Sequence, residues 1–125
     1  MDLRSRERLG LKLQDVWGYF DTILGGDTFA PQGNKLRGKL RLYKQGHRGL
    51  LDATSMLPEG DPAHALALDL VDYDDLDNET ALNQQARAGR SIAKDIGKRF
   101  QIDVRTGEPI RSSADKRRSR PSSRR

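Results

Sequence analysis

The strongest hydrophobic pattern of the chain lies between residues 9 and 24. Its apolar side chains recur at intervals of four, three, four and three residues, which places them on one stripe of an α-helix. A glycine pair at positions 25 and 26 is expected to end this helix, because glycine adopts the left-handed cap conformation without a steric penalty. The helix also carries three of the seven aromatic side chains, so we expect it to form the centre of the core. The stripe consists of Leu9, Leu13, Val16, Phe20 and Ile23, and Trp17 and Leu24 widen it.

A second helical pattern follows residues 27 to 34, whose composition is typical of a loop. Asn34 is the expected N-cap, and three apolar side chains after it recur at helical spacing. The same stretch also alternates apolar or small residues with Lys and Arg, as a half-buried strand would, and of these alternatives we prefer the helix. Gly46 and Gly49 interrupt this pattern, and residues 50 to 57 after them are expected to form at most two helical turns. The apolar positions of the preferred helix are Leu36, Leu40 and Tyr43.

Two further helices are expected in the second half of the chain. Asp61 and Pro62 suit a helix start, because Asp caps the first turn and Pro has no N–H that needs a partner there. Asn78 suits the start of a last long helix that reaches about Phe100. Small residues within its apolar stripe imply that another helix approaches closely. The expected core positions are Ala63, Leu66, Leu70 and Val71 in the first of these helices, and Leu82, Ala86, Gly89, Ile92 or Ala93, Ile96 and Phe100 in the second.

The composition favours an all-α fold, a small helical domain of about four helices. Leucine outnumbers isoleucine and valine together by 16 to 8, and β-branched residues are the ones that favour strands. A chain of 125 residues suits one domain, which we place at residues 1 to 108. Residues 109 to 125 form an Arg/Ser-rich stretch that has no apolar side chain larger than alanine after residue 110. We therefore expect a disordered basic C-terminal tail, because such a segment cannot offset the entropy cost of ordering.

The net charge of +5 is unevenly distributed along the chain. Residues 111 to 125 carry seven Lys or Arg and one Asp, whereas residues 1 to 110 sum to about −1. Within the domain, a basic segment at residues 35 to 48 contrasts with an acidic segment at residues 69 to 79. The acidic segment lacks the spacing of an EF-hand calcium loop, so we interpret it as a solvated face that screens the basic segment.

The sequence offers little for catalysis or metal binding. It contains no cysteine, which excludes disulfides and thiolate metal sites, and neither His47 nor His64 belongs to a motif with a nucleophile. We expect a protein that is not an enzyme and that has no cofactor and no metal site. No apolar run approaches the roughly 20 residues that span a membrane, and no secretory signal is visible. We therefore expect no membrane partner and an intracellular, cytoplasmic location, or a nuclear one in a eukaryotic or viral source.

The basic segments are the strongest functional signal. Arginine matches phosphate through its planar fork of donors, and a flexible cationic tail neutralises phosphates with little sequence preference. The favoured hypothesis is a nucleic-acid-associated accessory protein that binds the phosphate backbone non-specifically, and RNA and DNA fit this pattern equally. The alternatives are a tail that serves as a solubiliser or localisation signal, and a protein-interaction adaptor or assembly protein that self-associates through oppositely charged faces. The candidate phosphate-binding residues are Lys35, Arg37, Lys39, Arg41, Lys44 and Arg48 in the basic segment, and Arg111, Lys116, Arg117, Arg118, Arg120, Arg124 and Arg125 in the tail.

Overall fold

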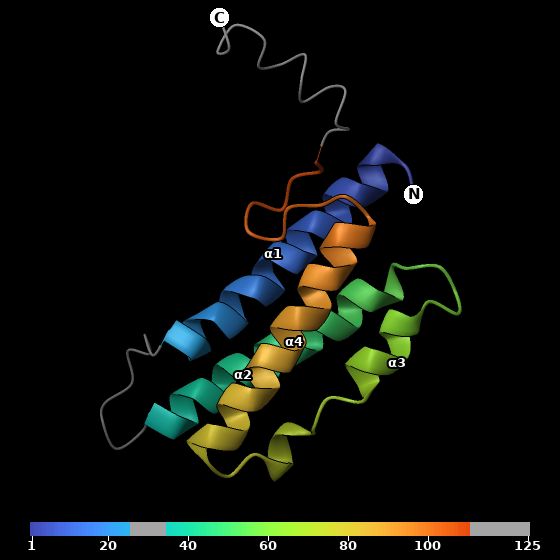
Figure 1. The fold of residues 1–125 in the computed structure, drawn as a ribbon. Coiled ribbons are helices and arrows are strands. Elements are labelled where there is room, and N and C mark those ends of the chain that lie inside the picture. Colours follow the sequence, from blue (N-terminus) through green and yellow to red (C-terminus); the bar gives the residue numbers. More distant parts are fainter. Residues whose placement is uncertain (26–34, 111–125) are drawn as a thin grey trace, which may run out of the picture.

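Four α-helices make up most of the computed structural model, which describes residues 1–25 and 35–110 (Figure 1). The long helices α1 (Leu3–Gly25), α2 (Lys35–Ser55) and α4 (Glu79–Arg99) pack against one another as a bundle. The short helix α3 (Pro62–Leu68) and a 3₁₀ turn, η2 (Tyr73–Asp75), connect α2 to α4. The expected all-α class with about four helices is confirmed.

The apolar stripe of α1 forms the centre of the core, as the sequence predicts. All five stripe side chains from Leu9 to Ile23 are fully buried, and Trp17 and Leu24 pack against them while partly exposed. The helix begins well before the stripe, at Leu3, because the Asp2 carboxylate caps it by accepting a hydrogen bond of 2.8 Å from Ser5 N. α1 therefore extends past the core at its N-terminal end.

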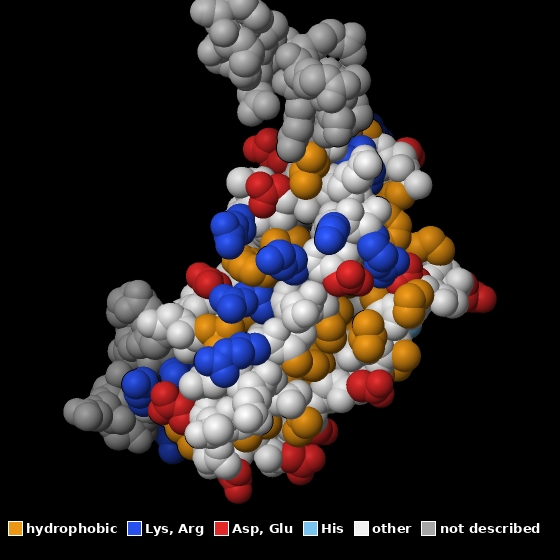
Figure 2. Space-filling view, viewed as in Figure 1, with side chains coloured by type: hydrophobic (Ala, Val, Ile, Leu, Met, Phe, Trp, Pro, Cys, Tyr) orange, Lys and Arg blue, Asp and Glu red, His pale blue; other side chains and the backbone are white. Residues whose placement is uncertain are grey.

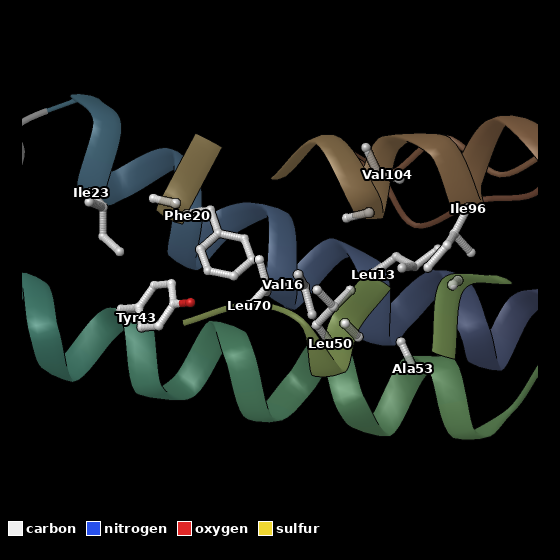
Figure 3. Packing of buried hydrophobic residues seen from close by; sticks show 14 of the residues in the cluster. Leu13, Val16, Phe20, Ile23, Tyr43, Leu50, Ala53, Leu70, Ile96 and Val104 are labelled. Atoms are coloured by element: carbon white, nitrogen blue, oxygen red, sulfur yellow. The ribbon is translucent and has the colours of Figure 1, made fainter. Parts of the chain in front are cut away.

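The ring of Phe20 lies between α2 and α4 (Figure 3). A Cβ atom on Gly46 of α2 would lie 2.6 Å from Cε1 of the ring, and one on Gly89 of α4 would lie 2.5 Å from Cε2. Carbon atoms in contact need about 3.5 to 4.0 Å, so both helices approach the ring as closely as only glycine permits. Tyr43 packs beside the ring, with the two centroids 5.8 Å apart. The close helix approach expected from the small residues of α4 is confirmed, and its cause is an aromatic ring of α1.

Helix α2 continues through both of its later glycines, so the expected short separate cluster after Gly49 is wrong. The preference for helix over strand is confirmed. A Cβ atom on Gly49 would lie 3.0 Å from Val16 Cγ2, and Gly46 faces Phe20, so both glycines serve close packing instead of ending the helix. The expected N-cap, Asn34, lies outside the described residues. The buried positions of α2 are Lys39, Tyr43, Gly46, Leu50, Ala53 and Thr54, while Leu36 and Leu40 are partly buried.

Helix α3 begins as expected, and the predicted core positions Ala63 and Leu70 are buried, with Val71 partly buried. Asp61 is the N-cap, and its side chain accepts a hydrogen bond of 2.9 Å from Ala63 N. The prediction that Leu66 faces the core is wrong, because Ala67 is buried instead and Leu66 is 45% exposed. The bidentate pair between Arg99 of α4 and Asp61, with both N···O distances 2.9 Å, holds the start of α3 against α4. This pairing also holds the pKa of Asp61 below its usual range.

Helix α4 has the predicted limits. Its N-cap is Asn78, whose side chain accepts a hydrogen bond of 2.8 Å from Ala81 N, and its C-cap is Phe100. The small and apolar stripe is confirmed, with Ala93 as the buried member of the pair left open by the sequence and Ile92 partly buried.

Residues 100 to 110, which we call the strap, fold back over the N-terminal half of α1 (Figure 1). Ile102 and Val104 are buried, and an isolated antiparallel bridge joins Ile102 to Pro109. Arg6 of α1 fixes the strap by donating to three of its carbonyl oxygens, those of Phe100 (3.0 Å), Gln101 (2.8 Å) and Ile110 (3.1 Å). Packed structure thus continues past the boundary expected at residue 108. The remainder of the expected tail, residues 111 to 125, lies outside the described residues.

No helix in the described ranges combines the length and the apolar character that crossing a membrane requires.

Candidate nucleic-acid interface

The exposed cations of α2 form one straight row. Arg37, Arg41, Lys44 and Arg48 are spaced by four, three and four residues and are all exposed. At 100° per residue, this row lies opposite the buried face that contains Tyr43 and Leu50. The structure therefore places four of the six predicted residues of the basic segment together, on the exposed side of one helix, and we call this surface the α2 row.

Lys39 does not belong to this row, and its place in the fold makes it unavailable to phosphate. Its side chain is 3% exposed, and its Nζ lies 2.9 Å from the Glu79 carboxylate and 3.4 Å from Asn83 Oδ1. Lys35 approaches the same carboxylate at 3.9 Å. The hydrogen bond from Lys39, helped by the charges of both lysines, holds the pKa of Glu79 below its usual range. The expected screening of the basic segment by the acidic one thus occurs at the start of α4, where Lys39 is a structural residue.

A second acidic contact lies at the other end of the α2 row. Lys44 and Arg48 border a hollow of about 290 Å³ that Asp72 and Tyr73 also line. The Lys44 ammonium lies 4.8 Å from the centre of the Tyr73 ring, which favours this position through a cation–π contact. The carboxylate of Asp72 makes this end of the row less attractive to an anion than the end at Arg37 and Arg41.

A groove between α1 and α4 brings together four cations that lie outside the basic segments suggested by the sequence. It has a volume of about 390 Å³ and takes side chains from α1, α4 and the strap. Figure 2 shows Lys and Arg side chains in a row across this face of the molecule, where α4 lies in front. We call it the α1–α4 groove, and its lining residues are Trp17, Asp21, Arg87, Arg90, Ser91, Lys94 and Arg105.

Most of the groove's positive charge is not neutralised. Arg90 pairs with Asp21, with Nη1 and Oδ1 3.1 Å apart. Within residues 1–25 and 35–110, no carboxylate lies within 4.0 Å of the charged groups of Arg87, Lys94 or Arg105. Unpaired cations that converge on a concave surface create a positive potential that attracts anions.

The indole of Trp17 lines this positive region, and two of its arginines lie over the ring. The guanidinium carbon of Arg90 is 5.1 Å from the ring centre, and that of Arg105 is 5.5 Å away. Both distances are within the range of cation–π contacts. The groove therefore combines unneutralised charge with a partly exposed aromatic surface.

Sequence reasoning did not assign the groove to phosphate binding, although part of the signal is present in α4. Arg87, Arg90, Lys94 and Lys98 are spaced by three, four and four residues, which places them on one side of the helix, away from the buried stripe. The pairing of this row with Trp17 and the strap depends on contacts between distant parts of the chain. The predicted tail cations, from Arg111 to Arg125, all lie outside the described residues.

The two histidines bond to the backbone. His47 Nε2 lies 3.2 Å from the carbonyl oxygen of Ala67, and His64 Nε2 lies 3.1 Å from that of Pro58. Among the residues that the structure describes, no group of three or more His, Asp or Glu is arranged to hold a metal ion.

Comparison with known proteins assigns neither a family nor a relative: no protein-family model matches the chain, and no curated protein or solved structure shows significant similarity to it.

Proposed function

We propose that this protein is a non-enzymatic, nucleic-acid-associated accessory protein that binds the phosphate backbone through the α1–α4 groove, with the α2 row and the basic tail as additional contacts. The observation that supports this proposal is the separation of charge. Residues 1 to 110 have a net charge of about −1, and yet the groove has four cations around one carboxylate. Such local accumulation costs repulsion within the fold, and a polyanionic ligand offsets that cost.

The groove is favoured over the α2 row as the main contact because of its shape. Cations from α4 and the strap approach the concave surface from two sides, so a bound phosphate can meet more than one of them at once. The α2 row lies along a single helix, and its Arg48 end lies in a hollow that Asp72 also lines. Both surfaces are expected to show little preference for base sequence, since phosphate contacts carry no direct sequence information.

The test compares two charge-matched variants of the full chain. Binding of a single-stranded oligonucleotide would be measured by fluorescence anisotropy at several salt concentrations. Each phosphate neutralised adds about −0.7 to the slope of log K against log salt for single strands. The triple variant R87Q/K94Q/R105Q should therefore reduce the slope by about 2, whereas R37Q/R41Q/R48Q, which removes the same charge from the α2 row, should reduce it by less than about 1.

Truncation after Ile110 tests the tail separately. If about half of its seven cations engage a duplex at once, the slope should fall by about 3 to 4. The melting temperature should stay the same, because the removed residues offer no large apolar side chain to the core. Equal binding by the full and truncated chains at every salt concentration would leave the tail as a solubiliser or a localisation signal. Absence of binding by the full chain at low salt would refute the proposed function.

A second candidate is self-association through opposite charges. Figure 2 shows several acidic side chains at the end of the molecule opposite the strap, while others lie near the strap and among the basic side chains. Head-to-tail contact between such faces would produce an assembly protein. Sedimentation velocity at low and high salt distinguishes this function, because association through these faces should weaken as salt screens the charges.

A further inference from the structure

We propose that the α1–α4 groove takes a single-stranded nucleic acid, with one unpaired base stacked on the indole of Trp17. This inference rests on the proposed function and narrows its ligand from any phosphate backbone to a single strand. It starts from a combination that phosphate binding does not need, which is an aromatic ring in the lining of a cationic groove. Grooves that bind single strands combine these two features, since the cations follow the backbone and the ring stacks on a base.

Trp17 is held in place from below by the core. Its neighbours on the α1 stripe, Val16 and Phe20, are fully buried, and Trp17 packs against this cluster while keeping part of its surface exposed. A ring fixed in this way loses little conformational entropy when a base stacks on it.

Two arginines lie around the indole, and different contacts position them. Arg90 is fixed by its ion pair with Asp21 at 3.1 Å. Arg105 lies in a turn of the strap, where its N–H donates to Asp103 Oδ1 (2.9 Å) and its carbonyl oxygen accepts from Gln14 Nε2 (3.3 Å). Both guanidinium groups lie over the indole ring, so an incoming base takes the place of one of them, and that arginine then donates to a phosphate oxygen.

The geometry favours a single strand over a duplex. The groove volume of about 390 Å³ is within the range of about 300 to 1,000 Å³ typical of small-molecule pockets, so it suits a splayed base and its phosphate. In a duplex, both faces of each base are covered by neighbouring base pairs, and reaching the indole would require unstacking. A single strand has no such cost at an unstacked base.

The experiment uses the full chain and its only tryptophan as a reporter. Oligothymidylate, oligouridylate and a DNA duplex of equal length would be titrated while tryptophan emission and the anisotropy of a labelled strand are recorded. We expect both single strands, or one of them, to quench the emission and to bind about tenfold more tightly than the duplex. The two oligonucleotides distinguish DNA from RNA as the source of the base.

Two variants separate stacking from a structural role of the ring. Trp17→Leu keeps an apolar cover on the core but removes the stacking surface, and we expect it to lose the single-strand preference while its salt slope stays unchanged. Tyr19→Leu removes a partly exposed aromatic ring of the same helix that does not line the groove, and it should retain the preference. A cooperative melt of both variants, followed by circular dichroism, confirms that they fold, and Trp17→Met, which is also apolar and not aromatic, replaces Trp17→Leu if the latter does not.

The outcomes are distinguishable. Salt-dependent binding without quenching and with equal affinity for single strands and duplex would overturn the stacking proposal and leave the proposed function intact. A folded Trp17→Leu variant that still prefers single strands by about tenfold would also overturn it. If the wild-type chain binds none of the three probes at low salt, the proposed function fails and this inference fails with it.

Discussion

The close approach of Gly46 and Gly89 to the ring of Phe20 leads to a specific prediction for Gly46→Ala. The new Cβ would lie 2.6 Å from the ring, and the ring cannot move aside because its opposite edge already meets Gly89. Overpacking of this kind costs about 1 to 3 kcal/mol. Replacing glycine with alanine inside a helix otherwise stabilises it by about 1 kcal/mol. The two effects oppose each other, so the informative quantity is the difference from a glycine that has free space around it.

Gly18 provides that matched reference, because it lies in α1 and a Cβ added there would meet no atom within 4 Å. Gly18→Ala should raise the free energy of unfolding by about 1 kcal/mol. Gly46→Ala should fall short of this value by about 1 to 3 kcal/mol. Urea unfolding of both variants, followed by far-UV circular dichroism, measures the difference.

A double-mutant cycle with Phe20→Leu assigns the cost to the ring. Phe20→Leu is destabilising by itself, but in that background the Cβ of Gly46→Ala no longer meets an aromatic edge. The coupling free energy should therefore be about 1 to 2 kcal/mol, with the alanine better tolerated when the ring is absent. If Gly46→Ala stabilises the wild-type protein as much as Gly18→Ala does, the helices are not held together around Phe20 and the reasoning is refuted.

The contacts at the edges of the bundle lead to two more expected outcomes. Lys39 lowers the pKa of Glu79, so the stability gained from this pair is present above the usual glutamate pKa of 4.5 and is lost as the pH falls through the lowered value. Glu79→Gln should therefore destabilise the protein at pH 7 but much less at pH 3 in urea melts, whereas Gln in place of the exposed Glu59 should change neither melt. Arg6→Lys should cost on the order of 1 kcal/mol for each strap hydrogen bond that it loses, and unchanged hydrogen exchange of the strap amides in this variant would contradict that role.

The parts of the fold that could be predicted from sequence have strong local signals. The stripe of α1 consists of large apolar side chains at helical spacing, and burial of such side chains is the main favourable term in folding. The limits of α4 follow from the side chain of Asn78, which caps the first turn without help from any other element. Where the residues of a segment determine its structure without contacts to other segments, the structure can be predicted from the sequence of that segment.

The incorrect predictions for α2 and α3 concern positions whose structure depends on contacts with a distant element of the chain. Gly46 resembles a helix end until the ring of Phe20, from another helix, occupies the space beside it. In α3, Leu66 and Ala67 are both compatible with the helical spacing that starts at Ala63, and the smaller side chain is buried. Spacing alone does not distinguish these two positions.

The candidate site was only partly predictable for the same reason. The α2 row follows from spacing, but the removal of Lys39 from it depends on Glu79, forty residues away in the chain. The α1–α4 groove joins Trp17 and Arg105 with a row of α4, and no local pattern connects these segments.

The strap has a consequence for synthesis of the protein on the ribosome. The residues that it covers lie at the start of the chain: Gly10 contacts Gly107, and the hydrogen bonds of Arg6 reach 94 to 104 residues ahead. A nascent chain therefore exposes the Leu9 end of α1 until nearly all of the helical domain has emerged. Contacts of such long sequence separation form late, because the loop between them must close first. The first helix to be translated is thus the last to be fully covered, and a chaperone that holds apolar segments would have its longest opportunity there.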